Sequence, residues 1–201
     1  MNKEWSELNK TMQIQLKKEA TFGEGTSTLL ILRQKLFDEL NRLKRELNRE
    51  EFNAIPFINA DGYHSKTIAY SIWHIFRIED IVAHSLIKSD EQIFFSGNYQ
   101  ARICVPIITT GNELVKEQIS EFSELLDLEE LYEYIYTVKN STDKILKELK
   151  YPDIKRKMTD KDKEYLQSLS VVSTDENAYW LIDYWCGKDI RGLIQMPFSR
   201  H

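Results

Sequence analysis

The most informative part of the chain is SKTIAYSIWHIFRIEDIVAHSLIK, which runs from Ser65 to Lys88. On a helix, where successive residues are turned by about 100°, its apolar side chains fill one wide arc. The arc is formed by Ile68, Ile72, Ile75, Phe76, Val82, Ala83 and Leu86. Such an arc is typical of a helix that packs against a protein core. Because serine is a common helix cap, we expect Ser65 to begin a helix that continues to about Lys88.

Two ionisable side chains of this stretch need an explanation. Glu79 falls near the middle of the apolar arc, where a carboxylate needs a partner or a ligand. It is either a structural partner for an arginine or a helix end, or a catalytic group. His74 lies off the edge of the arc and is either a histidine satisfied by a hydrogen bond or a metal ligand or catalyst. The two point about 140° apart, so they cannot readily hold one ion together.

The same three-and-four spacing of apolar residues recurs before this helix. Residues 26–48 carry Leu29, Leu32, Leu36, Leu40 and Leu43 at that spacing, which predicts a second long helix. Thr26, Ser27 and Thr28 offer its N-cap. A shorter amphipathic helix is expected over residues 3–20, and Gly23 and Gly25 are expected to end it.

Patterns after residue 88 are also mainly helical. Further helices are expected over 108–125, 128–150, 159–169 and 173–186, with Gly187 as a C-cap. Residues 89–106 have an irregular pattern, and 103–109 is compatible with a short strand. We therefore predict an all-α fold in which the three long helices, at 26–48, 65–88 and 128–150, pack roughly antiparallel around one core. Residues 1–201 are expected to form one domain, with 1–22 as an N-terminal helical extension.

The composition excludes several classes of protein. Hydrophobic residues make up 42% of the 201 residues and charged ones 29%, which indicates a packed globular chain rather than a disordered one. The net charge of −5 argues against a nucleic-acid partner, because such proteins need a basic face. The basic residues of 144–163 alternate with acidic ones, which is typical of a solvated helix surface.

The compartment is predicted from the N-terminus and the cysteines. Met1–Trp5 is charged and lacks the apolar run of a secretory signal, and no stretch has the ~18 apolar residues of a membrane-spanning helix. Cys104 and Cys186 lie far apart in the chain and form no CxxC pair. We therefore expect a cytoplasmic protein with reduced thiols and no membrane partner. Cys186 is expected to be a free core thiol rather than a reactive one.

The decapeptide SIWHIFRIED, Ser71–Asp80, resembles the second-helix signature of the DinB-like superfamily. In that signature a Trp-His pair is followed by a hydrophobic turn, a basic residue and Glu-Asp. The resemblance in sequence is close over these ten residues. Over the rest of the chain only the expected helix lengths and the connector before Pro106 resemble the family. The resemblance implies an antiparallel four-helix bundle of DinB type, with a long crossover between the second and third helices and additional short helices.

The resemblance also implies a divalent metal site, for zinc, nickel or iron. Many DinB-like proteins hold such an ion through the signature histidine, here His74, and an HxxxH pair on the last helix. His201 falls where the first histidine of that pair is expected, and the chain stops there. Either the final helix covers about 176–201 with a kink, or this chain is shortened; Pro197 fits a helix start better than an interior position. We expect an occupied site only where another group or a second subunit completes it.

The other two histidines are not obvious third ligands. His64 precedes the helix, and His84 points about 80° away from His74. Phosphate-loop, dinucleotide, nucleophile-elbow and HExxH motifs are missing from the sequence.

Two hypotheses for function follow from the resemblance. One is a metal-dependent hydrolase or thiol S-transferase that acts on a small molecule or a thiol, because an open metal lowers the pKa of a bound water or thiol. The alternative is a non-catalytic DinB-fold module for binding or for a stress response. We also predict a homodimer, since such bundles leave an apolar strip and aromatic residues make up 11% of the chain. Four of them are expected to serve in core and interface packing: Tyr179, Trp180, Tyr184 and Trp185.

Overall fold

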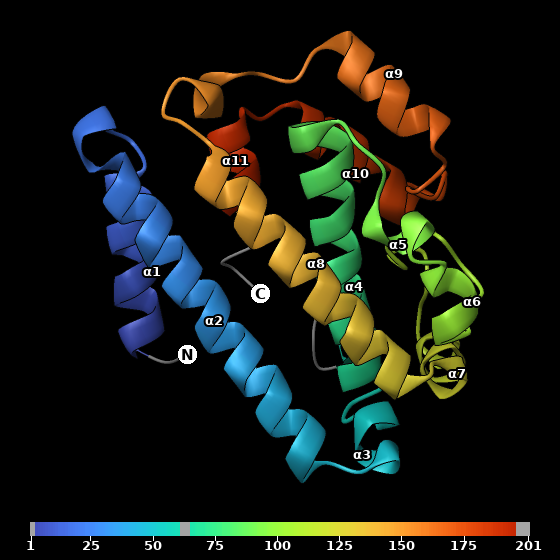
Figure 1. The fold of residues 1–201 in the computed structure, drawn as a ribbon. Helices are drawn as coiled ribbons and strands as arrows, with labels where there is room; N and C mark the ends of the chain where they lie inside the picture. The colour runs from blue at the N-terminus through green and yellow to red at the C-terminus, as the bar shows by residue number, and fades with distance from the viewer. Residues whose placement is uncertain (1–2, 61–64, 196–201) are drawn as a thin grey trace.

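The computed structural model describes residues 3–60 and 65–195. Within these ranges every regular element is a helix, and the only β-type pairing is an isolated bridge between Lys157 and Asp189 (Figure 1). The prediction of an all-α fold is confirmed for this part of the chain. None of the helices described is both long enough and apolar enough to cross a bilayer.

The elements follow one another along the chain as helices of very different lengths. They are α1 (Lys3–Gln15), a 3₁₀ turn (Glu19–Thr21), α2 (Phe22–Glu46), α3 (Arg49–Asn53), α4 (Ile68–Asp80), a π-helical segment (Ile81–Lys88), α5 (Ile93–Ser96), α6 (Tyr99–Ile103), α7 (Glu117–Leu125), α8 (Leu128–Glu148), a 3₁₀ turn (Asp153–Lys155), α9 (Asp160–Ser168), α10 (Glu176–Cys186) and α11 (Ile190–Gln195). The three longest predicted helices therefore exist as α2, α4 with its π-helical continuation, and α8.

These three helices do not all alternate in direction. α2 runs opposite to both α4 and α8, as expected, whereas α4 and α8 run the same way (Figure 1). Residues 89–127, which carry α5, α6 and α7, return the chain to the end of the molecule where α4 began. A connection of this length is what allows two consecutive long helices to lie parallel, so the antiparallel prediction is wrong for the α4–α8 pair.

The start of α2 differs from the prediction for a steric reason. α2 begins at Phe22, so Gly23 and Gly25 lie in its first turns instead of ending the preceding helix. A Cβ atom at Gly25 would lie 2.9 Å from the backbone nitrogen of Leu16, so the missing side chain lets the end of α1 approach α2 closely. The N-terminal segment thereby adds fully buried Met12 and Leu16 to the core.

The segment before α8 is less helical than expected. Only Glu117–Leu125 of the predicted 108–125 helix forms, and 103–109 is not a strand. Gly111 and Lys116 have positive φ values, 78° and 49°, which interrupt any regular helix. Two short helices, α5 and α6, occupy the part of the chain that was expected to be irregular.

The last helices are capped where the sequence indicated. The side chain of Thr159 accepts from the backbone N–H of Asp162 at the start of α9, and Gly187 is the C-cap of α10. α11 begins separately at Ile190, so α10 does not continue as one kinked helix through residue 195. Pro197 and His201 lie outside the described residues.

Buried apolar side chains form two clusters rather than the single core that was predicted. One joins α1, the first half of α2, the π-helical segment, the end of α8 and α9–α11. The other joins the second half of α2, α3, α4, the α5–α7 crossover and the start of α8. Trp73, in the signature stretch, is completely buried in the second cluster.

Candidate functional site

Three side chains of α4 hold the segment that precedes α7. Tyr70, His74 and Arg77 are spaced four and three residues apart, so they lie on one stripe of the helix. The Tyr70 hydroxyl donates to the carbonyl oxygen of Gly111 at 2.8 Å, and Arg77 Nε donates to that of Ile108 at 2.9 Å. His74 Nδ1 lies 2.8 Å from the carbonyl oxygen of Thr110. These bonds satisfy backbone carbonyls that no regular helix or strand takes up.

The contact with Thr110 fixes the proton on the His74 ring. A carbonyl oxygen can only accept, so Nδ1 carries the hydrogen that is donated to Thr110. The ring is stacked on Tyr70, with centroids 5.6 Å apart and planes inclined by 11°. The side chain is partly exposed. This is the arrangement that orients a histidine for metal binding, and it is equally that of a histidine held for structural reasons.

Glu113 is a carboxylate of the same site that sequence reasoning missed. One of its oxygens, Oε2, is buried without a hydrogen-bond partner in the described structure. The other accepts from the Thr109 hydroxyl. Burial raises the pKa of Tyr70, and the negative charge of Glu113 raises it further, so Tyr70 remains a neutral donor. No sequence signal marked Glu113, because its position depends on how residues 105–116 fold over α4.

Below this stripe, Asp80 anchors the start of the crossover. Its carboxylate accepts from the backbone N–H groups of Ile93 and Phe94, both at 2.9 Å, and from the Tyr134 hydroxyl at 2.9 Å. Arg77 Nη1 lies 3.4 Å away. Burial raises the pKa of Asp80, against the opposing effects of Arg77 and these hydrogen bonds. The position of Asp80 at the end of α4 thus makes it a structural anchor for α5.

Glu79 forms a buried ion pair with an arginine. This was one of the two roles predicted for it from the sequence. Its two oxygens accept from Nη1 and Nη2 of Arg33 at 2.9 and 2.8 Å. Arg33 Nε also donates to Asp143 at 2.6 Å, and Lys139 Nζ donates to the same carboxylate at 2.8 Å. Burial opposes the charge on Arg33, but Glu79 and Asp143 outweigh it and raise the Arg33 pKa. Glu79 is therefore committed to a structural contact between α2 and α4.

Of the two predicted metal ligands, only His74 lies within the described residues, so the pairing of His74 with His201 stays a prediction. His201 and His64 lie outside the described residues. Residues 3–60 and 65–195 contain no group of three or more histidine, cysteine or acidic side chains placed to hold an ion. His84 instead contacts Asp90 and Ser141. Burial raises the pKa of Cys186, in keeping with the expectation of an unreactive thiol.

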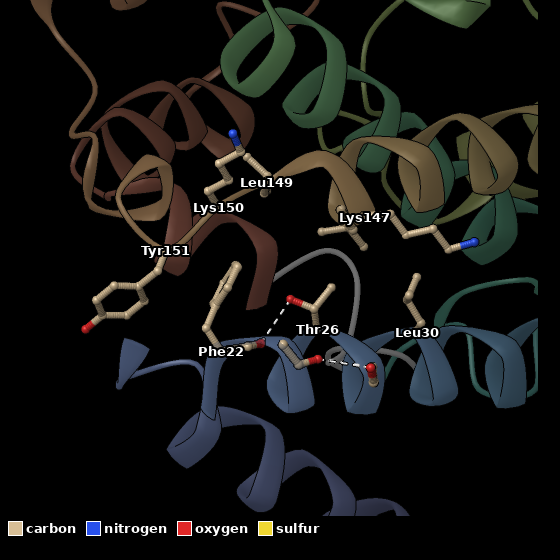
Figure 2. A pocket seen from close by; sticks show the side chains of 10 residues that line it. Phe22, Thr26, Leu30, Lys147, Leu149, Lys150 and Tyr151 are labelled. Atoms are coloured by element: carbon tan, nitrogen blue, oxygen red, sulfur yellow. Dashed lines mark hydrogen bonds between the residues drawn. The ribbon is translucent and has the colours of Figure 1, made fainter. Parts of the chain in front are cut away.

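A groove of about 580 Å³ lies away from these side chains, between the start of α2 and the end of α8 (Figure 2). Phe22, Thr26 and Leu30 of α2 form one side, and Lys147 and Tyr151 stand opposite. Its lining is mostly apolar and includes none of the histidines or carboxylates described above. The groove is therefore separate from the His74 site.

No protein-family model matches the chain, and no curated protein matches it.

Proposed function

We propose that this chain is a DinB-like helical-bundle protein that binds a divalent metal ion through His74 Nε2. The observation that supports the proposal is the hydrogen bond from Nδ1 to the Thr110 carbonyl oxygen. Metal-binding histidines commonly donate their second ring N–H in this way, which fixes the tautomer and orients the ring. The long crossover between α4 and α8 supports the four-helix DinB-type arrangement.

His201 remains the proposed second ligand, and Glu113 is added as a candidate carboxylate. Glu113 lies three residues beyond Thr110, and its Oε2 is buried without a hydrogen-bond partner among the described residues. A carboxylate oxygen and imidazole nitrogens are a ligand set that suits zinc, nickel or iron(II). These three side chains could together bind one ion. A further group or a second subunit would complete its coordination.

The proposed chemistry is that of a hydrolase or a thiol S-transferase acting on a small molecule or a thiol. A bound ion with an open position would lower the pKa of water or of a thiol and so supply a nucleophile near neutral pH. Two residues of this chain would orient the imidazole ligand of that ion. Thr110 accepts a hydrogen bond from His74, and Tyr70 stacks on the ring.

The test is the metal content of protein purified without a histidine tag. We expect about one zinc, nickel or iron per complete site and its loss in His74→Ala, whatever stability is lost with the bond to Thr110. Tyr70→Phe is the matched control, because it removes the bond to Gly111 and leaves the imidazole in place. Unchanged metal content in His74→Ala, together with a loss of about 1–3 kcal/mol of stability, would show that the histidine is structural.

The alternative is a non-catalytic DinB-fold module for binding or for a stress response. Protein that takes up no zinc, nickel or iron, even when dialysed against each ion, would support this alternative.

A further inference from the structure

We infer that Ser141, His84 and Asp90 form an activated serine nucleophile that can be acylated by a carboxylic ester or phosphonylated by a reactive phosphonate. The inference is independent of the proposed metal site. His84 Nδ1 lies 2.6 Å from Asp90 Oδ1, and His84 Nε2 lies 3.1 Å from the Ser141 hydroxyl oxygen. The three side chains come from the π-helical segment, the residues just after it, and α8.

Local backbone geometry explains how Asp90 reaches His84. The π-helical segment ends at Lys88, and its C-cap Ser89 has a φ of 58°, which turns the chain back towards the helix. The backbone N–H of Asp90 then donates to the carbonyl oxygen of His84 at 2.9 Å. The aspartate is thus held to His84 by its main chain as well as by its carboxylate, which keeps the imidazole in one orientation. π-helical turns are rare, and they occur frequently at functional sites.

The hydrogen bonds from Ser141 to His84 and from His84 to Asp90 have the arrangement that activates a serine hydroxyl as a nucleophile. An ionised carboxylate only accepts, so His84 Nδ1 carries the hydrogen and Nε2 has a lone pair. With a neutral imidazole, the hydroxyl of Ser141 is the donor and Nε2 is the acceptor. This is the proton order of a Ser-His-Asp triad, in which the histidine acts as the general base and the aspartate fixes its tautomer. Ser141 is partly exposed, whereas the His84 side chain is only 4% exposed.

Other helical hydroxyls in this protein behave differently. Ser71, Ser123 and Thr137 each donate to the carbonyl oxygen four residues earlier in their own helix. That bond is the usual one for a serine or threonine within a helix. Ser141 instead contacts His84, which lies on another element. The serine proton is therefore directed to a base rather than to its own backbone.

The proposed reaction is an acyl transfer that begins with attack by Ser141 on an ester. Ser141 Oγ forms a bond to the ester carbonyl carbon while its proton passes to His84 Nε2. The carbon–oxygen bond to the alcohol then breaks, and His84 gives the proton to the departing alkoxide. Water attacks the acyl-serine with His84 as base, and the carboxylic acid and free serine are released.

An alkyl fluorophosphonate tests the inference directly. Its reaction forms the Oγ–P bond, breaks the P–F bond and releases fluoride and the serine proton. We expect intact-mass spectrometry of the full chain to show one adduct, and peptide mapping to place it on Ser141. Ser141→Ala should not react, and His84→Gln should slow labelling by roughly 10²-fold, the order that general-base catalysis contributes.

Asp90→Asn and Ser71→Ala complete the experiment. Asp90 is 44% exposed, so its substitution should leave the fold intact and slow labelling through the tautomer of His84 alone. Ser71→Ala is the matched control and should label at the unchanged rate, since its hydroxyl is bonded to the Thr67 carbonyl oxygen. No adduct on Ser141, or an adduct whose rate is the same in His84→Gln and Asp90→Asn, would overturn the inference. Metal removal by a chelator should have no effect on labelling, which separates this site from the one at His74.

Discussion

Arg33 and Glu79 illustrate how single residues are constrained in this protein. Both side chains are almost completely buried, at 3% and 1% exposure, and each would be costly to leave without the other. The sequence marked Glu79 as a carboxylate within an apolar arc, and the structure supplies its partner from another helix. The same logic applies to Asp80, which is satisfied by two backbone N–H groups and a tyrosine. Buried charge in α4 therefore serves contacts between elements.

Removing Glu79 should destabilise the protein strongly. Glu79→Ala would leave the Arg33 guanidinium buried with only part of its charge compensated, so we expect a loss of about 3–5 kcal/mol in urea-induced unfolding. The control is Glu39→Ala, an exposed carboxylate paired with Arg42 on the surface of α2, where we expect a change below about 1 kcal/mol. A double change of Arg33→Met and Glu79→Leu should recover much of the loss. Equal stabilities for Glu79→Ala and Glu39→Ala would contradict this account.

At the level of secondary-structure elements, α4 and its π-helical continuation organise the molecule. One stripe of α4 anchors residues 108–111 through Tyr70, His74 and Arg77. The π-helical segment brings His84 to α8, and the turn at Ser89 brings Asp90 to His84. The His74 site therefore depends on contacts between α4 and residues 108–111. The His84 site depends on the π-helical end of the same helix and on α8.

The packing of α1 against α2 should depend on one glycine and not on its neighbour. Gly25→Ala would place a Cβ 2.9 Å from the Leu16 backbone nitrogen, so the end of α1 must shift and we expect the melting temperature to fall. At Gly23 nothing lies within 4 Å of the corresponding Cβ. Gly23→Ala is thus the matched control and should be neutral or stabilising by up to about 1 kcal/mol, because alanine favours helix. A fall in melting temperature of the same size for both variants would argue against the steric explanation.

For the molecule as a whole, one group of exposed aromatic side chains lies on α10. Trp185 is completely buried, whereas its neighbours on α10, Tyr179, Trp180 and Tyr184, are 42%, 50% and 40% exposed. The rings of Trp180 and Tyr184 pack edge to face with centroids 5.5 Å apart. Aromatic side chains that remain partly exposed in a cluster are typical of protein–protein interfaces. The core part of the aromatic prediction is confirmed for Trp185, and the interface part stays a prediction for the other three.

We expect the protein to be a homodimer that uses this aromatic face of α10. Trp180→Lys should shift the mass measured by light scattering at tens of micromolar from that of a dimer to that of a monomer. Tyr136→Lys is the control, since Tyr136 is similarly exposed, at 53%, but lies on α8. A monomeric unmodified protein at that concentration would refute the dimer, and a dimer that persists in Trp180→Lys would place the interface elsewhere.

The helical class, the positions of the long helices to within a few residues and several caps could be predicted from the sequence. These features depend on residues a few positions apart, so periodicity and capping residues report them. The long-range contacts could be seen only in the folded protein. Glu79 pairs with Arg33, which lies 46 residues earlier, and His84 contacts Ser141, which lies 57 residues later. The tertiary structure also replaced part of the expected 108–125 helix with a segment whose carbonyls bond to α4. No local pattern encodes these choices, because a long-range hydrogen bond or ion pair satisfies a buried polar group only after the chain has brought distant elements together.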